Sequence, residues 1–161
     1  MPILLDDYVV HAHCTGAGLY VKDVTYGGSS VMREPLDASR MRHGAEFRIV
    51  CGAGGASLDA TVADKDGKGV PDISVVAVPA DAVSASQMST AIAWTQTDQN
   101  GQCSLTGLAL GKYRVLAVAK TVEMTPETLG ALSSALPSKA EDVELGEDQR
   151  ASVLLAPSSL N

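Results

Sequence analysis

The fold is decided at residues 97–108, which read TDQNGQCSLTGL and lead into GKYRV at residues 111–115. Alternating residues run away from Asn100-Gly101 on both sides, so the pattern predicts strand, tight turn, strand, short loop and strand. We expect both turn residues to adopt the positive φ angles of a hairpin turn. A similar pair of strands stands upstream, joined by the polar turn at residues 65–69. Together these segments predict a small antiparallel β-sandwich.

Composition limits the chain to one domain, or to one complete domain plus a fragment. Of the 161 residues, 45% are hydrophobic but only 4% are aromatic, so Val, Leu, Ile and Ala must build the core. The net charge of −7, with no run of basic residues, argues against nucleic acid as a partner. No apolar stretch approaches the roughly 18 residues of a membrane-spanning helix.

The first residues, MPILLDD, have neither the basic and apolar regions nor the cleavage site of a signal peptide. Two interpretations stay open. The protein remains inside the cell, or the chain is a mature or excised piece of a longer secreted protein. The cysteine count of three does not decide between them, because an odd number allows one pair and one thiol, or three thiols.

Residues 1–55 predict a partial β unit, with strands expected at 7–14, 19–26 and 45–51. Three strands enclose too little apolar surface to form a stable core alone. This unit must therefore share a core with the rest of the chain or with something outside it. The expected boundary is the GAGG sequence at residues 52–55. Residues 56–161 then hold strands expected near 57–63, 70–79, 89–97, 102–107, 112–120, 140–145 and 149–156.

One helix is expected after Thr125, which supplies an N-cap, with Pro126 in the first turn. Three leucines then recur at helical spacing up to Pro137, namely Leu129, Leu132 and Leu136. The predicted class is therefore all-β. It is an antiparallel Greek-key β-sandwich of about seven strands with one short helix, preceded by the partial β unit.

Four short motifs between residues 56 and 157 carry a family resemblance. They are the Asp64–Gly67 turn, Val70-Pro71 with Ile73 and Val75, the Thr97-Asp98 to Gly101 hairpin, and Gly107-Leu108 with Gly111–Val115. On these, the unit resembles the carboxypeptidase regulatory-like domain, a transthyretin-like (prealbumin-like) seven-stranded sandwich. Three positions depart from that pattern. Cys103 replaces an aromatic residue, Ala109-Leu110 replaces a proline-containing loop, and Asp59-Ala60 stands where glycine is common.

The first 55 residues resemble the back half of another such unit, as in tandem bacterial envelope proteins. The likeness rests on Tyr8–Val10, Gly18–Val24 and Tyr26–Gly28. The resemblance implies a structural, adhesive or accessory module in an extracellular or cell-envelope setting, with catalysis left to neighbouring domains. We accordingly predict no catalytic residues and no cofactor.

His11 and His13 are the best metal candidates, because alternate residues of a strand point the same way. A site would need a further ligand such as His43, Glu46 or Asp23, and two surface histidines explain the pattern equally well. His43 and Glu46 also form the H-x-x-E quartet of zinc carboxypeptidases. No histidine follows His43, so we expect a solvated turn there and no bound metal.

Cys14 and Cys51 are the candidate disulfide, near the ends of the first and third expected strands. If those strands are neighbours or face each other, the bond is feasible and stabilises the unit by about 3 kcal/mol. If they are not, both thiols stay free. Cys103 is expected to point inward as a small buried hydrophobe. A catalytic cysteine would need a histidine base, and all three histidines lie in residues 1–55.

Four remaining features have simple expectations. Asp64–Gly67 lacks the further ligands of a calcium loop and is expected to be a turn. Asp98 is expected to accept a hydrogen bond within its own turn. The acidic residues near the end of the chain are expected to form a solvated edge, namely Glu141, Asp142, Glu144, Glu147 and Asp148. Trp94 is a candidate for ligand stacking, or a core or interface anchor.

These features predict a non-catalytic structural or interaction module of a secreted or cell-envelope protein, with proteins or further copies of itself as partners. A half-sandwich exposes apolar faces and unpaired edges, which either preceding residues or another subunit must cover. Donation between subunits would build a fibre or surface array. The alternative is a carbohydrate- or peptide-binding accessory module that uses Trp94 and nearby tyrosines. A metalloenzyme built on His11, His13 and His43 has the least support.

Overall fold

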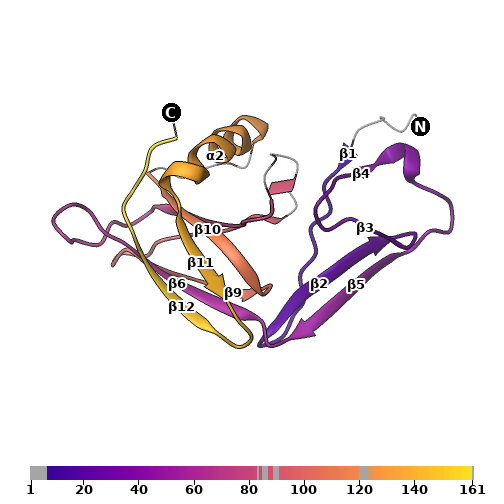
Figure 1. The fold of residues 1–161 in the computed structure, drawn as a ribbon, viewed down its shortest axis with the longest axis horizontal. Coiled ribbons are helices and arrows are strands. Elements are labelled where there is room, and N and C mark those ends of the chain that lie inside the picture. Colours follow the sequence, from indigo (N-terminus) through magenta and orange to yellow (C-terminus); the bar gives the residue numbers. More distant parts are fainter. Residues whose placement is uncertain are drawn as a thin grey trace.

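The computed structural model describes residues 7–82, 84, 87–88, 91–119, 123 and 125–160. Figure 1 shows a sandwich formed by the later part of the chain, with a long two-stranded arm leaning away from it. The elements in order are β1 (Asp7–Tyr8), β2 (Leu19–Tyr26), β3 (Ser29–Ser30), β4 (Leu36–Asp37), the 3-10 helix η1 (Ala38–Arg40), β5 (Phe47–Ala53), β6 (Ala56–Val62), β7 (Ser74–Pro79), β8 (Ala93–Gln96), β9 (Gln102–Leu108), β10 (Gly111–Val118), α2 (Pro126–Lys139), β11 (Glu141–Leu145) and β12 (Arg150–Leu155).

The sandwich consists of one sheet in the order β11-β10-β7-β8 and a second in the order β12-β6-β9. This confirms the predicted all-β sandwich with a short helix. One strand pair departs from the antiparallel expectation, because β12 runs parallel to β6. The tight turn after β11 carries the chain from the first sheet to the second. Strand β12 therefore pairs with β6 and does not form a hairpin with β11.

Strand β7 is buried along its whole length and lies inside its sheet, between β10 and β8. Val75 and Ala77 face the space between the two sheets, while Val76 and Val78 pack in a second core on the other side. That second core includes the three leucines of α2 and Leu116 of β10. The continuous apolar run in the sequence reflects a strand covered on both faces. The result is three layers, with α2 outside the two sheets (Figure 1).

Helix α2 begins as predicted. The Thr125 side chain accepts a hydrogen bond from the Thr128 backbone N–H at 3.2 Å, and Pro126 occupies the first turn. The helix ends at Lys139, so it continues two residues past Pro137, where the sequence predicted its end. Pro137 has no backbone N–H to donate within the helix, and Ala140 closes the last turn by donating to the Leu136 carbonyl at 3.3 Å.

The two predicted hairpins are wrong in one respect, because each joins strands of different sheets. The turn after β6 leads to β7, and the turn after β8 leads to β9. Each turn is organised by an aspartate. Asp98 accepts hydrogen bonds from the backbone N–H groups of Asn100 and Gln102, at 2.8 and 2.9 Å, which confirms its expected role. Asp64 accepts in the same way within its own turn, at 2.9 and 3.0 Å.

Asn100 does not adopt the positive φ expected of it, and only Gly101 does, at +75°. The two turns press against each other at the same end of the sandwich. A Cβ atom on Gly101 would lie 2.5 Å from the Val62 carbonyl oxygen. The buried Thr97 hydroxyl closes this corner by donating to the Val70 carbonyl at 2.8 Å and accepting from the Ile73 N–H at 3.0 Å.

The N-terminal part forms a third sheet in the order β3-β2-β5, with a small separate β1–β4 pair. Its core is small and contains Val24, Val31 and Leu36. The strand predicted over 7–14 is wrong beyond residue 8. Residues 9–14 keep the alternation of exposed and half-buried side chains, but Val10 and Ala12 pack against the small core on the face of the sheet. No neighbouring strand pairs with them among the described residues.

Candidate functional site

The arm formed by β2 and β5 has one apolar face. Other side chains cover this face over β2 but not over β5. Cross-strand pairs place Tyr26 with Phe47 and Val24 with Ile49 on the same side of the sheet. Val24 is 4% exposed, whereas Phe47 and Ile49 are 50% and 51% exposed. The covering residues therefore protect β2 and leave the apolar row of β5 open to solvent. The Phe47 ring packs beside the Tyr26 ring of β2, and the two ring centroids are 4.7 Å apart.

Strand β5 also lies at the edge of its sheet. It pairs with β2 on one side, and no other strand in the described part of the chain pairs with its free side. An edge strand with outward backbone groups and an apolar face readily accepts another strand. The candidate site is therefore the edge of β5 together with Phe47 and Ile49, which we call the β5 edge.

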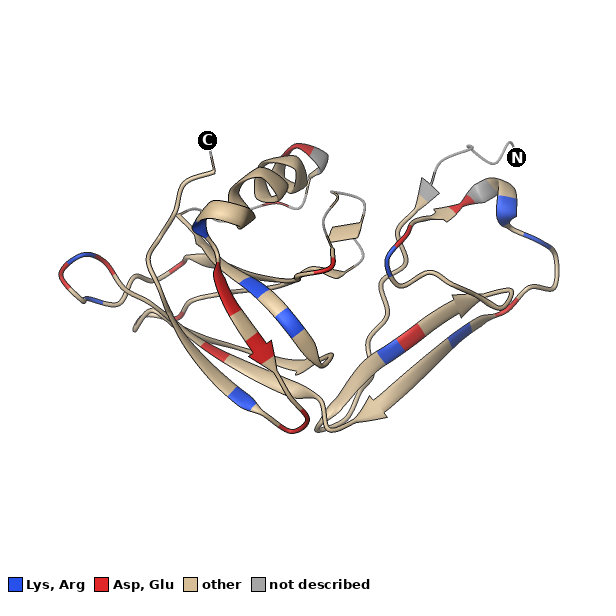
Figure 2. Cartoon of the chain, in the orientation of Figure 1, with Lys and Arg blue, Asp and Glu red and all other residues tan. Residues whose placement is uncertain are grey.

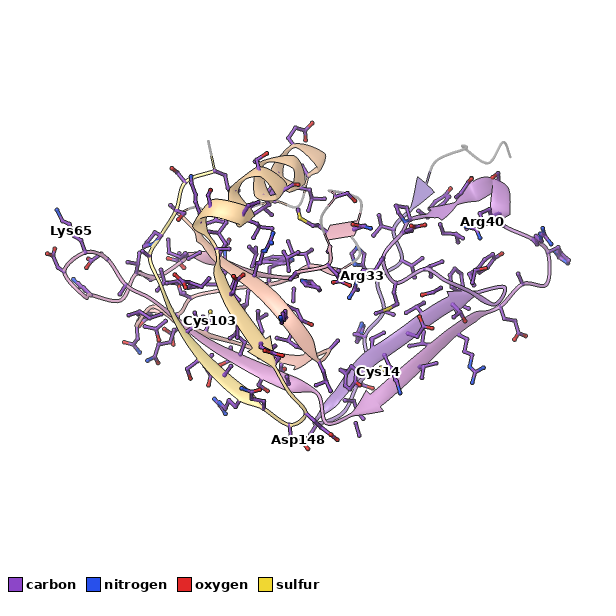
Figure 3. The ribbon with its side chains drawn as sticks, in the orientation of Figure 1. Cys14, Arg33, Arg40, Lys65, Cys103 and Asp148 are labelled. Carbon is purple, nitrogen blue, oxygen red and sulfur yellow. A yellow bond between two sulfur atoms is a disulfide. The ribbon has the colours of Figure 1, made fainter. Side chains whose placement is uncertain are left out.

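A disulfide holds the cover against β5. Cys14 and Cys51 are bonded, with Cα atoms 6.1 Å apart and a sequence separation of 37. The bond attaches residues 9–14 to the strand whose edge is free, and Figure 3 shows Cys14 at the base of the arm. The cover is thus fixed at one end of β5, while Phe47 and Ile49 lie toward the other end.

Glycines let the arm and the sandwich approach closely. Gly55 donates its backbone N–H to the Gly18 carbonyl at 2.8 Å. A Cβ atom on Gly107 of β9 would lie 2.9 Å from the Leu19 carbonyl oxygen. Within the arm, the Tyr20 ring lies over Gly52, where a Cβ atom would be 2.6 Å from it. The GAGG sequence therefore has a packing role as well as a linking one.

Within the described residues, His11 and His13 are not joined by a further ligand in an arrangement that could hold a metal. His11 and His13 are exposed, and so are His43 and Glu46 in the loop before β5. Across the described ranges, no group of three or more His, Cys, Asp or Glu side chains has an arrangement that could hold a metal ion. The same residues contain no helix long and apolar enough to cross a membrane.

Trp94 lies on β8, at an edge of its sheet, and is 48% exposed. It is therefore available to a partner or ligand and does not anchor the core. Cys103 is half-buried against the sandwich core, and this burial raises the pKa of its thiol to about 11. A thiol with so high a pKa is a poor nucleophile at neutral pH.

The acidic side chains expected at a solvated edge are exposed on β11 and in the turn after it. Figure 2 shows them as red segments on β11, beside the blue segments of β10. Asp142 lies 3.9 Å from Arg114, and the Asp142 side chain is 89% exposed. A pair so open to water contributes little to stability.

Sequence reasoning missed one polar cluster on the outer face of the second sheet. Asp59 of β6 accepts hydrogen bonds from Arg150 of β12 and from Ser104 of β9, the latter at 2.6 Å. Both bonds lower the pKa of the Asp59 carboxyl, with the Arg150 bond contributing most. The three residues come from strands that are far apart in sequence, so no local pattern could have revealed the cluster.

Comparison with known proteins yields structural likenesses only. No family model matches the chain, and no curated protein matches it. Among solved structures it is similar to BcpA, the major pilin subunit of Bacillus cereus (TM-score 0.44, 10% identity, 86% of this chain and 56% of that chain). It is also similar to GBS52, the minor pilin of Streptococcus agalactiae (0.43, 13%, 76% and 57%). A third is a putative carbohydrate binding protein from Pseudomonas aeruginosa (0.44, 14%, 64% and 88%).

These TM-scores are below 0.5 and the identities are below 25%, so the likenesses carry no argument about function. The chain spans less than two thirds of either pilin chain. The functional argument therefore rests on the β5 edge itself.

Proposed function

We propose that this chain is a non-catalytic structural module of a secreted or cell-envelope protein that assembles by strand addition at the β5 edge. The observation that carries the proposal is the half exposure of Phe47 and Ile49 on a strand whose outer side pairs with no other strand of the described residues. In this proposal residues 1–55 are a partial β unit, and residues 56–161 are a complete unit of the carboxypeptidase regulatory-like type.

Strand addition would both pair the outer side of β5 and cover its open apolar face. An added strand supplies backbone hydrogen bonds to the outer side of β5 and apolar side chains to its open face. Complete burial of a large apolar side chain contributes about 1.5–3 kcal/mol. Phe47 and Ile49 start half exposed and would gain part of that amount each. The added strand comes from preceding residues of a longer chain or from a second copy.

Native mass distinguishes these sources. Light scattering after size-exclusion chromatography is expected to show assemblies larger than 16.6 kDa. The double variant F47E/I49E is expected to run as a monomer, because two charges on the open face oppose docking. The matched control is L154E, which alters a side chain 68% exposed on the second sheet and should leave the assemblies intact. A parent protein that is monomeric at high concentration would rule out donation between copies.

A second candidate is a carbohydrate- or peptide-binding accessory module, which the exposure of Trp94 favours. An exposed indole on an edge strand offers a surface for stacking. The prediction is saturable quenching of tryptophan fluorescence by a glycan or extended peptide, and Trp94 is the single tryptophan that reports it. No response across a panel of glycans and peptides would count against this candidate.

A further inference from the structure

A cleft of about 560 Å³ lies between the arm and the sandwich. Residues 10–14 and 16–21 line one side, and β9 with residues 91–93 lines the other. In Figure 3 Arg33 reaches toward the sandwich above this space, and Cys14 lies below it. The volume is within the range of about 300–1,000 Å³ that is typical of small-molecule sites.

The lining of the cleft combines apolar surface with positive charge. Its apolar side chains include Leu19, Met32, Ile92 and Leu108. Among the described lining residues Arg33 is the one Lys or Arg, His11 and His13 are the two titratable imidazoles, and none is Asp or Glu. This is notable in a chain with a net charge of −7. The cleft is therefore a local site that suits an anionic group on an apolar body.

Arg33 has unused hydrogen-bonding capacity in this cleft. Its Nε atom is buried and has no hydrogen-bond partner within the described part of the protein. The Asp81 carboxylate lies 3.7 Å from Nε, close enough for an ion pair but too far for a hydrogen bond. The Asp81 side chain is 72% exposed, so water solvates it. A buried N–H group without a partner is costly, and an acceptor from a ligand would remove that cost.

We propose that this cleft binds a small molecule that carries a carboxylate on an apolar body. After a rotation of the Arg33 side chain that opens the buried Nε to the cleft, the carboxylate accepts hydrogen bonds from Nε and a terminal nitrogen, in the two-pronged geometry that guanidinium and carboxylate groups share. The apolar body then contacts Leu19, Ile92 and Leu108. A free phosphate ion fits less well, because it has no apolar part to contact these walls. The inference does not rest on assembly at the β5 edge.

The test is isothermal titration calorimetry with a matched pair of ligands. N-acetyl-leucine carries a carboxylate, and N-acetyl-leucinamide has the same body without the charge. The parent protein is expected to bind the acid and not the amide, with inorganic phosphate binding at least about tenfold more weakly than the acid. Binding of the amide as strong as that of the acid, or of phosphate as strong as that of the acid, would overturn the proposal.

Variants locate the site. R33Q removes the charge and is expected to weaken binding of N-acetyl-leucine by about ten- to a hundredfold, as loss of a hydrogen bond between charged groups does. The matched control is R114Q, because Arg114 is similarly exposed and lies 3.9 Å from Asp142 but does not line the cleft. It should bind normally. D81N removes the competing carboxylate and is expected to bind as well as the parent or better.

Each variant is first checked for native circular dichroism and a cooperative melt. If R33Q folds and still binds with the parent affinity, the assignment to Arg33 is wrong. Equal weakening by R114Q would show that general charge, and not the cleft, governs binding. A D81N protein that folds but loses binding would also contradict the proposal.

Discussion

At the scale of single residues, stability depends on polar groups that have specific partners. Thr97 is 4% exposed, and its hydroxyl is the partner of both the Val70 carbonyl and the Ile73 N–H. Asp59 joins three strands through Arg150 and Ser104. Neither role is visible in the sequence, because each depends on groups brought together from distant positions.

Replacing Thr97 by Val keeps the shape but leaves the Val70 carbonyl and the Ile73 N–H without their partner. We expect T97V to lose about 1–3 kcal/mol of unfolding free energy, the cost of leaving buried polar groups unsatisfied. Urea denaturation measures this. The control T61V alters a half-buried threonine on β6 and should change stability by less than about 0.5 kcal/mol. Equal losses in the two variants would refute the role assigned to the Thr97 hydroxyl.

The lowered pKa of Asp59 makes stability depend on pH in a predictable direction. Because its folded pKa lies below the unfolded value, the ionised carboxylate stabilises the fold above that unfolded value, and this contribution is lost as pH falls through the folded pKa. D59N should therefore show a shallower loss of stability below about pH 4 than the parent. S104A, which removes one donor, should be intermediate. Denaturation midpoints across pH test this, and identical acid profiles would contradict it.

At the scale of elements, local sequence signals predicted the features that depend only on neighbouring residues, such as helix caps and turns. The N-cap at Thr125 and the Asx turn at Asp98 both appear as expected. Such signals do not show which sheet each strand joins. A turn that joins two strands of one sheet has the same residues as one that crosses between sheets, and the crossing is decided by packing around β7. The strand predicted over 7–14 failed because alternation reports burial and not hydrogen bonding.

Gly101 tests how tightly the two corner turns fit. G101A adds a methyl group next to the Val62 carbonyl at a positive φ, so it combines backbone strain with a clash. Gly67 has a similar φ of +78° but open space around it, so G67A carries the strain alone. We expect G67A to lose about 1 kcal/mol and G101A to lose more. Thermal melts compare the two, and equal losses would show that the corner accommodates the added group.

The disulfide should stabilise the arm. Reduction, or the double variant C14S/C51S, is expected to cost about 2–4 kcal/mol and to free residues 9–14 from β5. The measurement is the unfolding midpoint with and without dithiothreitol. C103S serves as the control, because Cys103 is the unpaired cysteine and its variant should respond to the reductant as the parent does. A midpoint that dithiothreitol leaves unchanged would contradict this role.

At the scale of the whole molecule, two cores are closed and the third is open. The sandwich core and the core beneath α2 are enclosed by their own strands and helix. The arm core covers Val24 but leaves Phe47 and Ile49 half exposed. The sequence predicted this imbalance, since too few strands precede residue 55 to enclose a core. It did not predict which strand would stay open, because that depends on where residues 9–14 lie.

The central claim is that another strand covers the β5 edge, and hydrogen exchange of β5 tests it most directly. In the assembled protein at high concentration, the backbone amides of residues 47–53 should exchange slowly. They should exchange faster in the monomeric F47E/I49E variant, while the amides of β7 exchange equally slowly in both. Fast exchange of residues 47–53 in an assembled parent protein would show that assembly uses another surface, and would contradict the account.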